Sequence, residues 1–332
     1  MIAAADLKTK QQQVEELYNE FELFSKNTPF PAEPAGLYRA VNHILSIPGK
    51  RLRPVLLMAA AEMFGASAKD AVAAAAAVEW YHNSTLVHDD IMDQADIRRG
   101  IPTVHKLYGI NTAINTGDVM IIKSYGLLAS LPCAKSVKTL EIFSKAAAEI
   151  IEGQTMDLDF ETRADVTETE YLKMIEFKTS VLLAAALEMG AVIGDAPEAD
   201  ARAVYEFGRS LGISFQIKDD WLDTFGEAGK IGKKVGGDIA RNKRTLLYLR
   251  ALSKADGDQK QALAALENET DTEAKIRGTL EIFDALHIKA DVEKTAADYF
   301  GRALAHLDSV QVSPERKEIL HELAHRIYNR DF

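Results

Sequence analysis

Apolar residues recur along most of the chain at intervals of three and four, the spacing that places them on one face of an α-helix. Alanine, leucine, glutamate and lysine dominate, and no run alternates apolar with polar residues as a half-buried strand does. The pattern predicts helices over residues 6–26, 35–47, 53–64, 67–98, 111–130, 135–157, 167–193, 199–225, 242–254, 258–266, 270–286, 289–307 and 313–328.

Proline and glycine fall between these segments, where helices are expected to end. The most glycine-rich stretch is "GEAGKIGKKVGGD", residues 226–238. No Ser/Pro-rich linker and no shift of composition separates one part of the chain from another. We therefore expect an all-α fold, a bundle of many helices, in a single domain spanning residues 1–332.

Composition and charge narrow the class of protein. Of 332 residues, 47% are hydrophobic and 27% charged, as in soluble globular proteins. Cys133 is the one cysteine, which excludes an internal disulfide and a Cys-rich zinc site and suits a cytoplasmic location. The net charge of −11 argues against nucleic acid as a partner. The longest apolar runs, near 55–61 and 71–78, are shorter than a membrane span of about 18 residues, and the N-terminus lacks a signal-peptide pattern, so we expect no stable membrane anchor.

Two acidic clusters share one spacing near the ends of apolar helices. In each, the first and last aspartates are four residues apart and so lie on one helix face, where like charges repel. The C-terminal end of a helix also disfavours anions. A solvated helix end would explain one such cluster, but two matched clusters favour binding of cations between facing helices. The clusters are Asp89, Asp90 and Asp93, and Asp219, Asp220 and Asp223.

The donor atoms of these clusters indicate the kind of metal. All are carboxylate oxygens, which favours Mg²⁺, or Mn²⁺, over zinc. Mg²⁺ typically takes one or two protein carboxylates and completes its shell with water and substrate phosphate. An EF-hand loop is excluded, because Ile91 occupies a position that requires Asp or Asn.

Basic residues flank both acidic clusters. Each taken alone would be a solvated side chain, but as a set they indicate two anion sites, one held through Mg²⁺ and one held directly. Neither a P-loop nor a GxGxxG dinucleotide fingerprint is present to explain them. The set is Lys50, Arg53, Arg98, Arg99, Lys178, Lys233 and Lys243, with His82.

Two phosphates above an apolar interior imply a substrate with a diphosphate head and a hydrocarbon tail. Tyr81, Thr85 and Asp89 form a row at four-residue spacing, and Phe215 precedes Asp219 in the same way. Such rows are often plain core. Here they would also form the walls of a central cavity beneath a metal-bound head group.

The motifs "GKRLRP", "HNSTLVHDDIMD" with "RRG", "GQTMDLDF", "FKTS", "FQIKDDWLD" and "GGDIARNK" together resemble the trans-prenyl diphosphate synthases of the polyprenyl synthetase family. The resemblance covers residues 49–243. It implies the all-α isoprenoid synthase fold, usually as a homodimer. It also implies 1'-4 trans head-to-tail condensation of isopentenyl diphosphate with an allylic diphosphate (dimethylallyl, geranyl or farnesyl).

The resemblance also assigns roles to individual residues. Asp89, Asp93 and Asp219 match those that hold three Mg²⁺ ions on the allylic diphosphate, and Thr179 and Gln216 match those that line the reacting carbons. Positions that hold the allylic diphosphate correspond to Arg98, Lys178, Lys233 and Lys243. Positions that hold isopentenyl diphosphate correspond to Lys50, Arg53, His82 and Arg99, and positions near the metals to Gln154 and Asp157.

Product length depends in this family on side chains just before the first aspartate. Ser84 and Thr85 are small there, and Tyr81 lies one turn deeper, about 5.4 Å along the helix. We expect a twenty-carbon, geranylgeranyl-type product with Tyr81 in the floor. The alternative is that Tyr81 faces another helix and the floor lies elsewhere. The loop 226–237 and the tail around Arg330 are candidate lids.

Two other classes of protein compete with this one. A terpene cyclase would share the cation chemistry, but its second motif is normally of an Asn/Ser/Glu type, unlike "KDDWLD". A non-catalytic partner subunit would be expected to lack some of the aspartates or basic residues that this chain retains.

Overall fold

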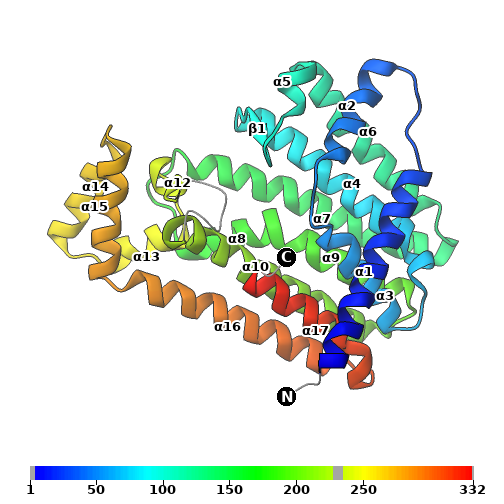
Figure 1. Ribbon diagram of the computed structural model, residues 1–332. Helices are drawn as coiled ribbons and strands as arrows, with labels where there is room; N and C mark the ends of the chain where they lie inside the picture. Colours follow the sequence, from blue (N-terminus) through cyan, green and yellow to red (C-terminus); the bar gives the residue numbers. More distant parts are fainter. Residues whose placement is uncertain (1–3, 227–234, 331–332) are drawn as a thin grey trace.

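The computed structural model describes residues 4–226 and 235–330, and these are almost entirely helical, which confirms the all-α prediction (Figure 1). The first half of the chain forms α1 (Ala4–Asn27), α2 (Ala35–Ser46), α3 (Leu52–Met63), α4 (Ala68–Met92), α5 (Val104–Tyr108), α6 (Ile110–Ala129) and α7 (Cys133–Phe160). The second half forms α8 (Glu168–Ile175), α9 (Val181–Ile193), α10 (Glu198–Phe225), α12 (Gly237–Ala240), α13 (Leu246–Lys254), α14 (Gly257–Glu267), α15 (Thr272–Ala285), α16 (Ile288–Ser309) and α17 (Pro314–Asn329).

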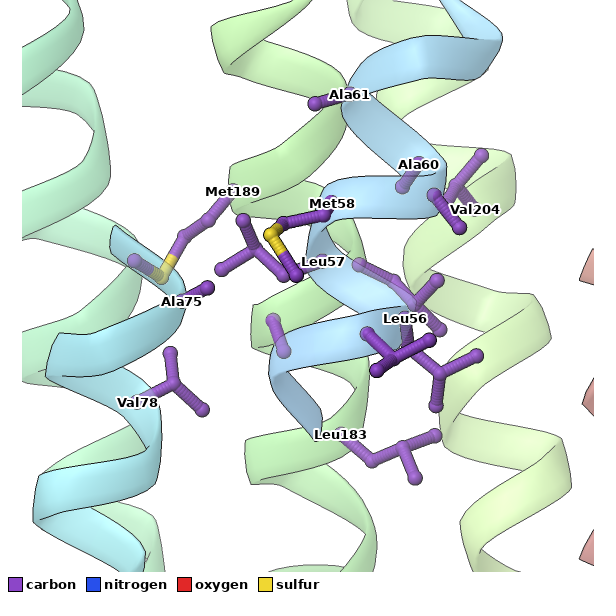
Figure 2. Close-up of a cluster of buried hydrophobic side chains, with 14 of the residues drawn as sticks. Leu56, Leu57, Met58, Ala60, Ala61, Ala75, Val78, Leu183, Met189 and Val204 are labelled. Atoms are coloured by element: carbon purple, nitrogen blue, oxygen red, sulfur yellow. The ribbon is translucent and has the colours of Figure 1, made fainter. Parts of the chain in front are cut away.

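The core is centred on α3, which packs against α4 and α9, with Val204 of α10 beside it (Figure 2). Leu56, Leu57 and Met58 on α3 are fully buried, with Val78 of α4 and Met189 of α9 beside them. Burying one such side chain contributes about 1.5–3 kcal/mol. This cluster fixes the positions of the long helices α4 and α10, which carry the two acidic clusters at their C-terminal ends.

After its polar first turn, helix α4 is apolar on every side as far as Val78, as expected of a helix surrounded by others. The alanines at 74–77 are fully buried, and their small side chains let α3 and α6 approach closely. Polar residues return at Glu79, and the helix emerges from the core as it reaches Asp89. The apolar run thus determines where the aspartates leave the interior.

The prediction of one helix over residues 67–98 was wrong at its C-terminal end. Helix α4 ends at Met92, and a two-residue antiparallel ladder follows, in which β1 (Ile97–Arg98) pairs with β2 (Ile101–Pro102). Left-handed backbone at Gln94, with φ 51°, and at Gly100, with φ 79°, turns the chain back on itself. The periodicity missed this hairpin because it is shorter than any detectable alternation.

The prediction of one helix over 167–193 holds for its extent but not for its geometry. Between α8 and α9 lies a π-helical turn, η1 (Glu176–Ser180), without a break in the chain. The predicted helix 242–254 begins only at Leu246, because Asn242 adopts a left-handed conformation with φ 55°. The short helices α5 and α12 were not predicted.

Helix α10 runs alongside α16, while α14 and α15 lie at the end of the molecule away from α3 (Figure 1). The assignment of residues 1–332 to one domain stays a prediction. Within the described parts of the chain, no helix is both long and apolar enough to cross a membrane.

Candidate active site

The first acidic cluster ends α4, and its members differ in surroundings. Asp93 is the exposed C-terminal cap of the helix, and its backbone N–H donates to the Asp89 carbonyl at 2.8 Å. Burial raises the pKa of Asp89, the Lys178 ammonium opposes that rise, and the Asp93 carboxylate adds to it. Asp89 and Asp93 are therefore neighbours facing a lysine that the sequence separates from them by more than eighty positions.

Asp90, by contrast, is directed into the protein and is 1% exposed. The hairpin brings Arg98 back over the end of α4, where its Nε lies 2.9 and 3.0 Å from the two oxygens of Asp90 and its Nη2 lies 2.8 Å from Oδ1. This forked contact is the strong form of the arginine–carboxylate pair. It orients Arg98 beside Asp89, whose carboxylate Arg98 also attracts.

Arg99, the next residue, points to a different loop. It has left-handed backbone, with φ 52°, and its Nη1 donates to the Pro48 carbonyl at 2.6 Å. Gly49 makes this approach feasible, since a Cβ there would lie 2.7 Å from the same Nη1 atom. The loop before α3 and the loop after α4 are thereby joined, which brings Arg99 to the motif that carries Lys50.

Three of the predicted basic residues come together: Arg53 on α3, His82 on α4 and Arg99 after α4. Burial, followed by the charges of Arg53 and Arg99, lowers the pKa of His82 well below its ordinary value, so the imidazole is neutral. The Nε of Arg53 is buried and has no hydrogen-bond partner among the described residues. A buried, unpaired donor is costly in a protein, so its presence in a group of cations indicates a site for an anion.

Sequence reasoning missed the counter-charge of this basic group. The buried Glu79 accepts a hydrogen bond of 3.0 Å from Nη1 of Arg51, and its Oε1 also accepts from Asn83 Nδ2 at 3.3 Å. The carboxylate also attracts Arg53 and Arg99. In the sequence, the one signal of this role is the position of Glu79, an acidic residue directly after the alanine-rich run of α4.

The second acidic cluster, at the end of α10, repeats this division. Asp220 is buried, and its oxygens accept from the Tyr171 hydroxyl at 2.5 Å and from Gln216 Nε2 at 2.9 Å. Burial, with the nearby Asp238, raises the pKa of Asp220 to about 7. Asp219 is partly exposed and pairs with Arg330 Nη2 at 2.6 Å. The central aspartate of each cluster is thus held by protein groups.

Asp223, the last member of the second cluster, holds the chain that returns after the loop. Its Oδ2 accepts the backbone N–H of Asp238 at 2.8 Å, and its carbonyl accepts that of Gly236 at 2.6 Å. Lys233 and most of the candidate lid 226–237 lie outside the described residues.

The π-helical turn η1 carries Lys178 and Thr179 between the two clusters. Lys178 Nζ contacts Asp157 Oδ2 at 2.5 Å, and Thr179 Oγ1 donates to Gln216 Oε1 at 3.1 Å. The turn lies against α7 at Gly153, where a Cβ would come within 2.4 Å of the Lys178 backbone nitrogen. π-turns inside α-helices are frequent at functional sites, because the extra residue re-aims the side chains around it.

A cavity of about 160 Å³ connects these groups. Its lining includes Asp157, Lys178, Thr179, Gln216, Asp220, Asp238 and Lys243. Burial lowers the pKa of Lys243, but nearby carboxylates, first among them Asp157 and Asp238, outweigh that effect. The pKa is raised on balance, so this lysine is charged. Groups from α7, η1, α10, α12 and the stretch after it therefore meet in one space, and the member of the acidic clusters among them is Asp220.

Within residues 4–226 and 235–330, no three His, Cys, Asp or Glu side chains converge as they do around a bound ion. The Lys178 ammonium contacts Asp157 and attracts Asp89, so a cation already lies among the carboxylates of the first cluster. The donors nearby are oxygens, including the buried Oε1 of Gln154, which has no partner among the described residues. Such a set suits Mg²⁺, which needs few protein ligands when a substrate supplies phosphate oxygens.

The chain-length residues lie on the buried side of α4. Ser84 and Thr85 turn their hydroxyls back to carbonyls of their own helix, at 2.7 and 2.8 Å. Tyr81 is 2% exposed and packs with its ring edge against Phe143 of α7, at 5.1 Å between ring centroids. The structure therefore places Tyr81 at the α4–α7 contact, two turns before Asp89.

Fold and site together define an all-α isoprenoid synthase fold, in which lysines and arginines lie beside two acidic helix ends. The sequence profile of the polyprenyl synthetase family matches residues 34–283. The chain belongs to the polyprenyl synthetase family.

Known relatives agree with this placement. The chain is 40% identical over 308 residues to geranylgeranyl diphosphate synthase of Methanosarcina mazei, covering 90% of this chain and 91% of that one. It is 36% identical to geranylfarnesyl diphosphate synthase of Natronomonas pharaonis, with 87% and 86% covered. A crystal structure of geranylgeranyl pyrophosphate synthase superposes with a TM-score of 0.91 at 41% identity, covering 95% of this chain and 98% of that one.

Proposed function

We propose that the protein is a trans-isoprenyl diphosphate synthase, a prenyltransferase that condenses isopentenyl diphosphate with an allylic diphosphate in 1'-4 head-to-tail fashion. The observation that carries the proposal is the place of Lys178: its charge acts on Asp89 of the first cluster, and it lines one cavity with Lys243 and with Asp220 of the second. The names of the relatives, which are synthases of prenyl diphosphates, support it.

The metal ligands proposed are Asp89, Asp93 and Asp219, whose carboxylates are half-buried or exposed. For Asp90 and Asp220 we revise the prediction from the sequence, because both are buried and bound by Arg98 and Tyr171, whereas Asp219, though paired with Arg330, is partly exposed. We propose that they position neighbouring groups. Bound Mg²⁺, for which three ions are proposed, would supply charge stabilisation to the departing diphosphate.

The cationic side chains act on the same leaving group. Lys178, Lys243 and Arg98 come from different elements. Lys178 and Arg98 are each held by a carboxylate, which keeps them oriented before the substrate arrives, and the charges of Asp157 and Asp238 act on Lys243. Preorganised charges of this kind favour the state in which negative charge develops on the diphosphate. They promote ionisation of the allylic carbon–oxygen bond and leave an allylic cation.

Isopentenyl diphosphate is assigned to the basic group of Lys50, Arg53, His82 and Arg99. Arg53 brings an unpaired buried donor, and the neutral His82 adds no charge to an already cationic surface. Thr179 and Gln216 line the cavity of Lys178 and Lys243, and we propose that their oxygens steady a cation without bonding to it. The proton lost after carbon–carbon bond formation is assigned to the released diphosphate.

A twenty-carbon product is the length proposed. Ser84 and Thr85 are small, and we propose that the ring of Tyr81, although it packs against Phe143 of α7, forms part of the floor. The geranylgeranyl diphosphate synthases among the relatives support this length.

A homodimer is proposed to form through α6 and α7, which pack against each other. Both carry rows of exposed apolar side chains, unusual on a free surface. The rows are Ile110, Ile114 and Ile122 on α6, and Val137, Ile151 and Leu158 on α7.

A cytoplasmic location is proposed because the lone Cys133 rules out an internal disulfide.

The function is tested by incubating the pure protein with isopentenyl diphosphate and each of dimethylallyl, geranyl and farnesyl diphosphate, with Mg²⁺ or with a chelator. Mass spectrometry is expected to show longer linear prenyl diphosphates only with the metal. Asp89→Asn should lower kcat about 10²–10³-fold, whereas Asp159→Asn, an exposed aspartate on the same helix as Asp157, should not. Cyclic hydrocarbon without condensation would instead identify a terpene cyclase.

A further inference from the structure

The carboxylate of Glu267, at the C-terminal end of α14, is the centre of a network of side chains. Arg244 Nη1 and the Tyr248 hydroxyl both contact its Oε1, and Arg244 Nη2 lies 3.4 Å from Oε2. The backbone carbonyl of Glu267 accepts two hydrogen bonds of 3.1 Å, one from Asn242 Nδ2 and one from Nζ of the buried Lys275. One residue of α14 thus holds both neighbours of Lys243.

Lys243 itself sits on a turn that needs such support. Asn242 has φ 55°, a left-handed conformation that costs energy for a residue with a side chain. The Lys243 N–H donates to the Asp238 carbonyl at 3.0 Å, and the Thr245 N–H donates to the Lys243 carbonyl at 2.9 Å. The turn directs the Lys243 ammonium into the cavity, toward Asp157 and Asp238.

Arg244 extends the network to the other wall of the cavity. Its Nε donates to the Arg163 carbonyl at 3.4 Å, in the loop that joins α7 to α8. Helix α7 carries Asp157, and α8 continues into the turn of Lys178. The guanidinium is 12% exposed, so its two contacts with Glu267 are only partly screened by solvent.

We propose that Glu267 is a positioning residue for the prenyl transfer: through Arg244 and Asn242 it holds the turn that places the Lys243 ammonium on the allylic diphosphate. The proposal rests on the assignment of Lys243 to that diphosphate. It gives a role in the chemistry to α14, which lies at the edge of the molecule and lines no part of the cavity of about 160 Å³ (Figure 1).

The test is a comparison of Michaelis constants. Glu267→Gln removes the charge and keeps the length, so the KM for the allylic diphosphate should rise about tenfold while that for isopentenyl diphosphate stays within about twofold. Glu269→Gln is the matched control, because Glu269 is exposed and accepts only a local hydrogen bond from the Asp271 N–H. Equal changes in both constants for Glu267→Gln would overturn the proposal.

A double-mutant cycle separates positioning from general loosening of the fold. If Glu267 acts through Lys243, the effect of Glu267→Gln should shrink to about twofold or less in a Lys243→Gln background. If instead the increase in KM from Glu267→Gln is the same with and without Lys243→Gln, Glu267 does not act through Lys243. Glu267→Asp retains the charge, and it should recover part of the lost apparent affinity.

A binding measurement distinguishes failure of this proposal from failure of the proposed function. Titration calorimetry measures the affinity of each protein for inorganic pyrophosphate in the presence of Mg²⁺. Wild-type protein that binds pyrophosphate but makes no prenyl diphosphate contradicts the proposed function alone. Affinity about tenfold weaker in Glu267→Gln then still supports the positioning role. Equal affinity in wild type, Glu267→Gln and Glu269→Gln contradicts the positioning role.

Discussion

The hydroxyl of Tyr81, on α4, donates a 3.0 Å hydrogen bond to the backbone carbonyl of Ala147, on α7. Its ring meets Phe143 edge-on, and Phe143 meets Tyr125 of α6 in the same way, each pair 5.1 Å apart between centroids. Three helices therefore fix the ring of Tyr81. A side chain held so firmly is suited to stop a growing hydrocarbon chain, since it cannot swing aside.

Replacing Tyr81 by Ala is expected to lengthen the product by at least one five-carbon unit, because the ring volume becomes available to the chain. Tyr81→Phe keeps the ring and should leave product length unchanged. That substitution should still lower the free energy of unfolding by about 1 kcal/mol, because the Ala147 carbonyl loses its partner. Product length is measured by mass spectrometry and stability by urea unfolding. An identical product spectrum for Ala, Phe and wild type would place the floor elsewhere.

Gly153 on α7 is expected to be essential to the shape of the site. A methyl group there would press on the backbone of the π-helical turn, and Gly153→Ala should therefore destabilise the fold by about 1–3 kcal/mol. It should also lower kcat, because Lys178 and Thr179 move with that turn.

The matched control for Gly153 is Gly301 on α16, where an added Cβ would meet no heavy atom within 4 Å. Gly301→Ala should stabilise the protein by about 0.5–1 kcal/mol through helix propensity. Thermal unfolding checks both substitutions. If Gly153→Ala were as stable and active as wild type, η1 would have to be more adaptable than its packing indicates.

Stability should depend on pH through His82. In the folded protein, burial and the nearby arginines lower the pKa of His82, whereas in the unfolded chain the imidazole has a pKa of about 6.5. Between those two pKa values the unfolded state binds the extra proton, so stability is complete above about pH 6.5 and is lost as pH falls. Going from pH 7.5 to 5.5, this one group should remove about 1.4 kcal/mol.

The contribution of His82 is isolated by comparison with His82→Gln, which has no titrating ring. Asp220 acts in the opposite direction, because its raised folded pKa of about 7 favours the folded state as pH falls. That contribution is common to both proteins and cancels in the difference. Urea unfolding at the two pH values measures it. Parallel losses in wild type and variant would mean that His82 keeps an ordinary pKa.

The dimer surface is tested at Ile122, on the exposed apolar row of α6. Ile122→Glu should convert the homodimer to monomer, because two carboxylates would have to be buried at the interface. Leu23→Glu, at another exposed apolar side chain on α1, should leave the dimer intact. Light scattering after size-exclusion chromatography gives the mass. A dimer that survives Ile122→Glu would point to a different surface.

Much of this site followed from local spacing. The four-residue repeat from Asp89 to Asp93 and from Asp219 to Asp223 fixes those carboxylates on common helix faces, whatever the rest of the fold. The apolar length of α4 and α10 predicted that both helices would be buried before they reached the aspartates. Neither inference needed a contact between distant residues.

Other features required the chain to close on itself. The pairing of Asp90 with Arg98 depends on a hairpin formed by left-handed residues, and helical periodicity masked it. Asp220 resembled its neighbours in sequence, and only the packing of α8 brought Tyr171 to it. Glu267 falls between two predicted helices, and nothing in its spacing indicates a contact with Arg244.

The sequence by itself determined the helices, their buried faces and which residue types would bear charge at the helix ends, because these depend on neighbours within one or two turns. Tertiary structure alone decided which aspartates are buried and which stay exposed, where Tyr81 and Glu267 find their partners, and how Lys178 and Lys243 come to line one cavity. Those outcomes depend on side chains brought together across long separations, and hydrogen bonds and charges act only at the short distances that folding creates.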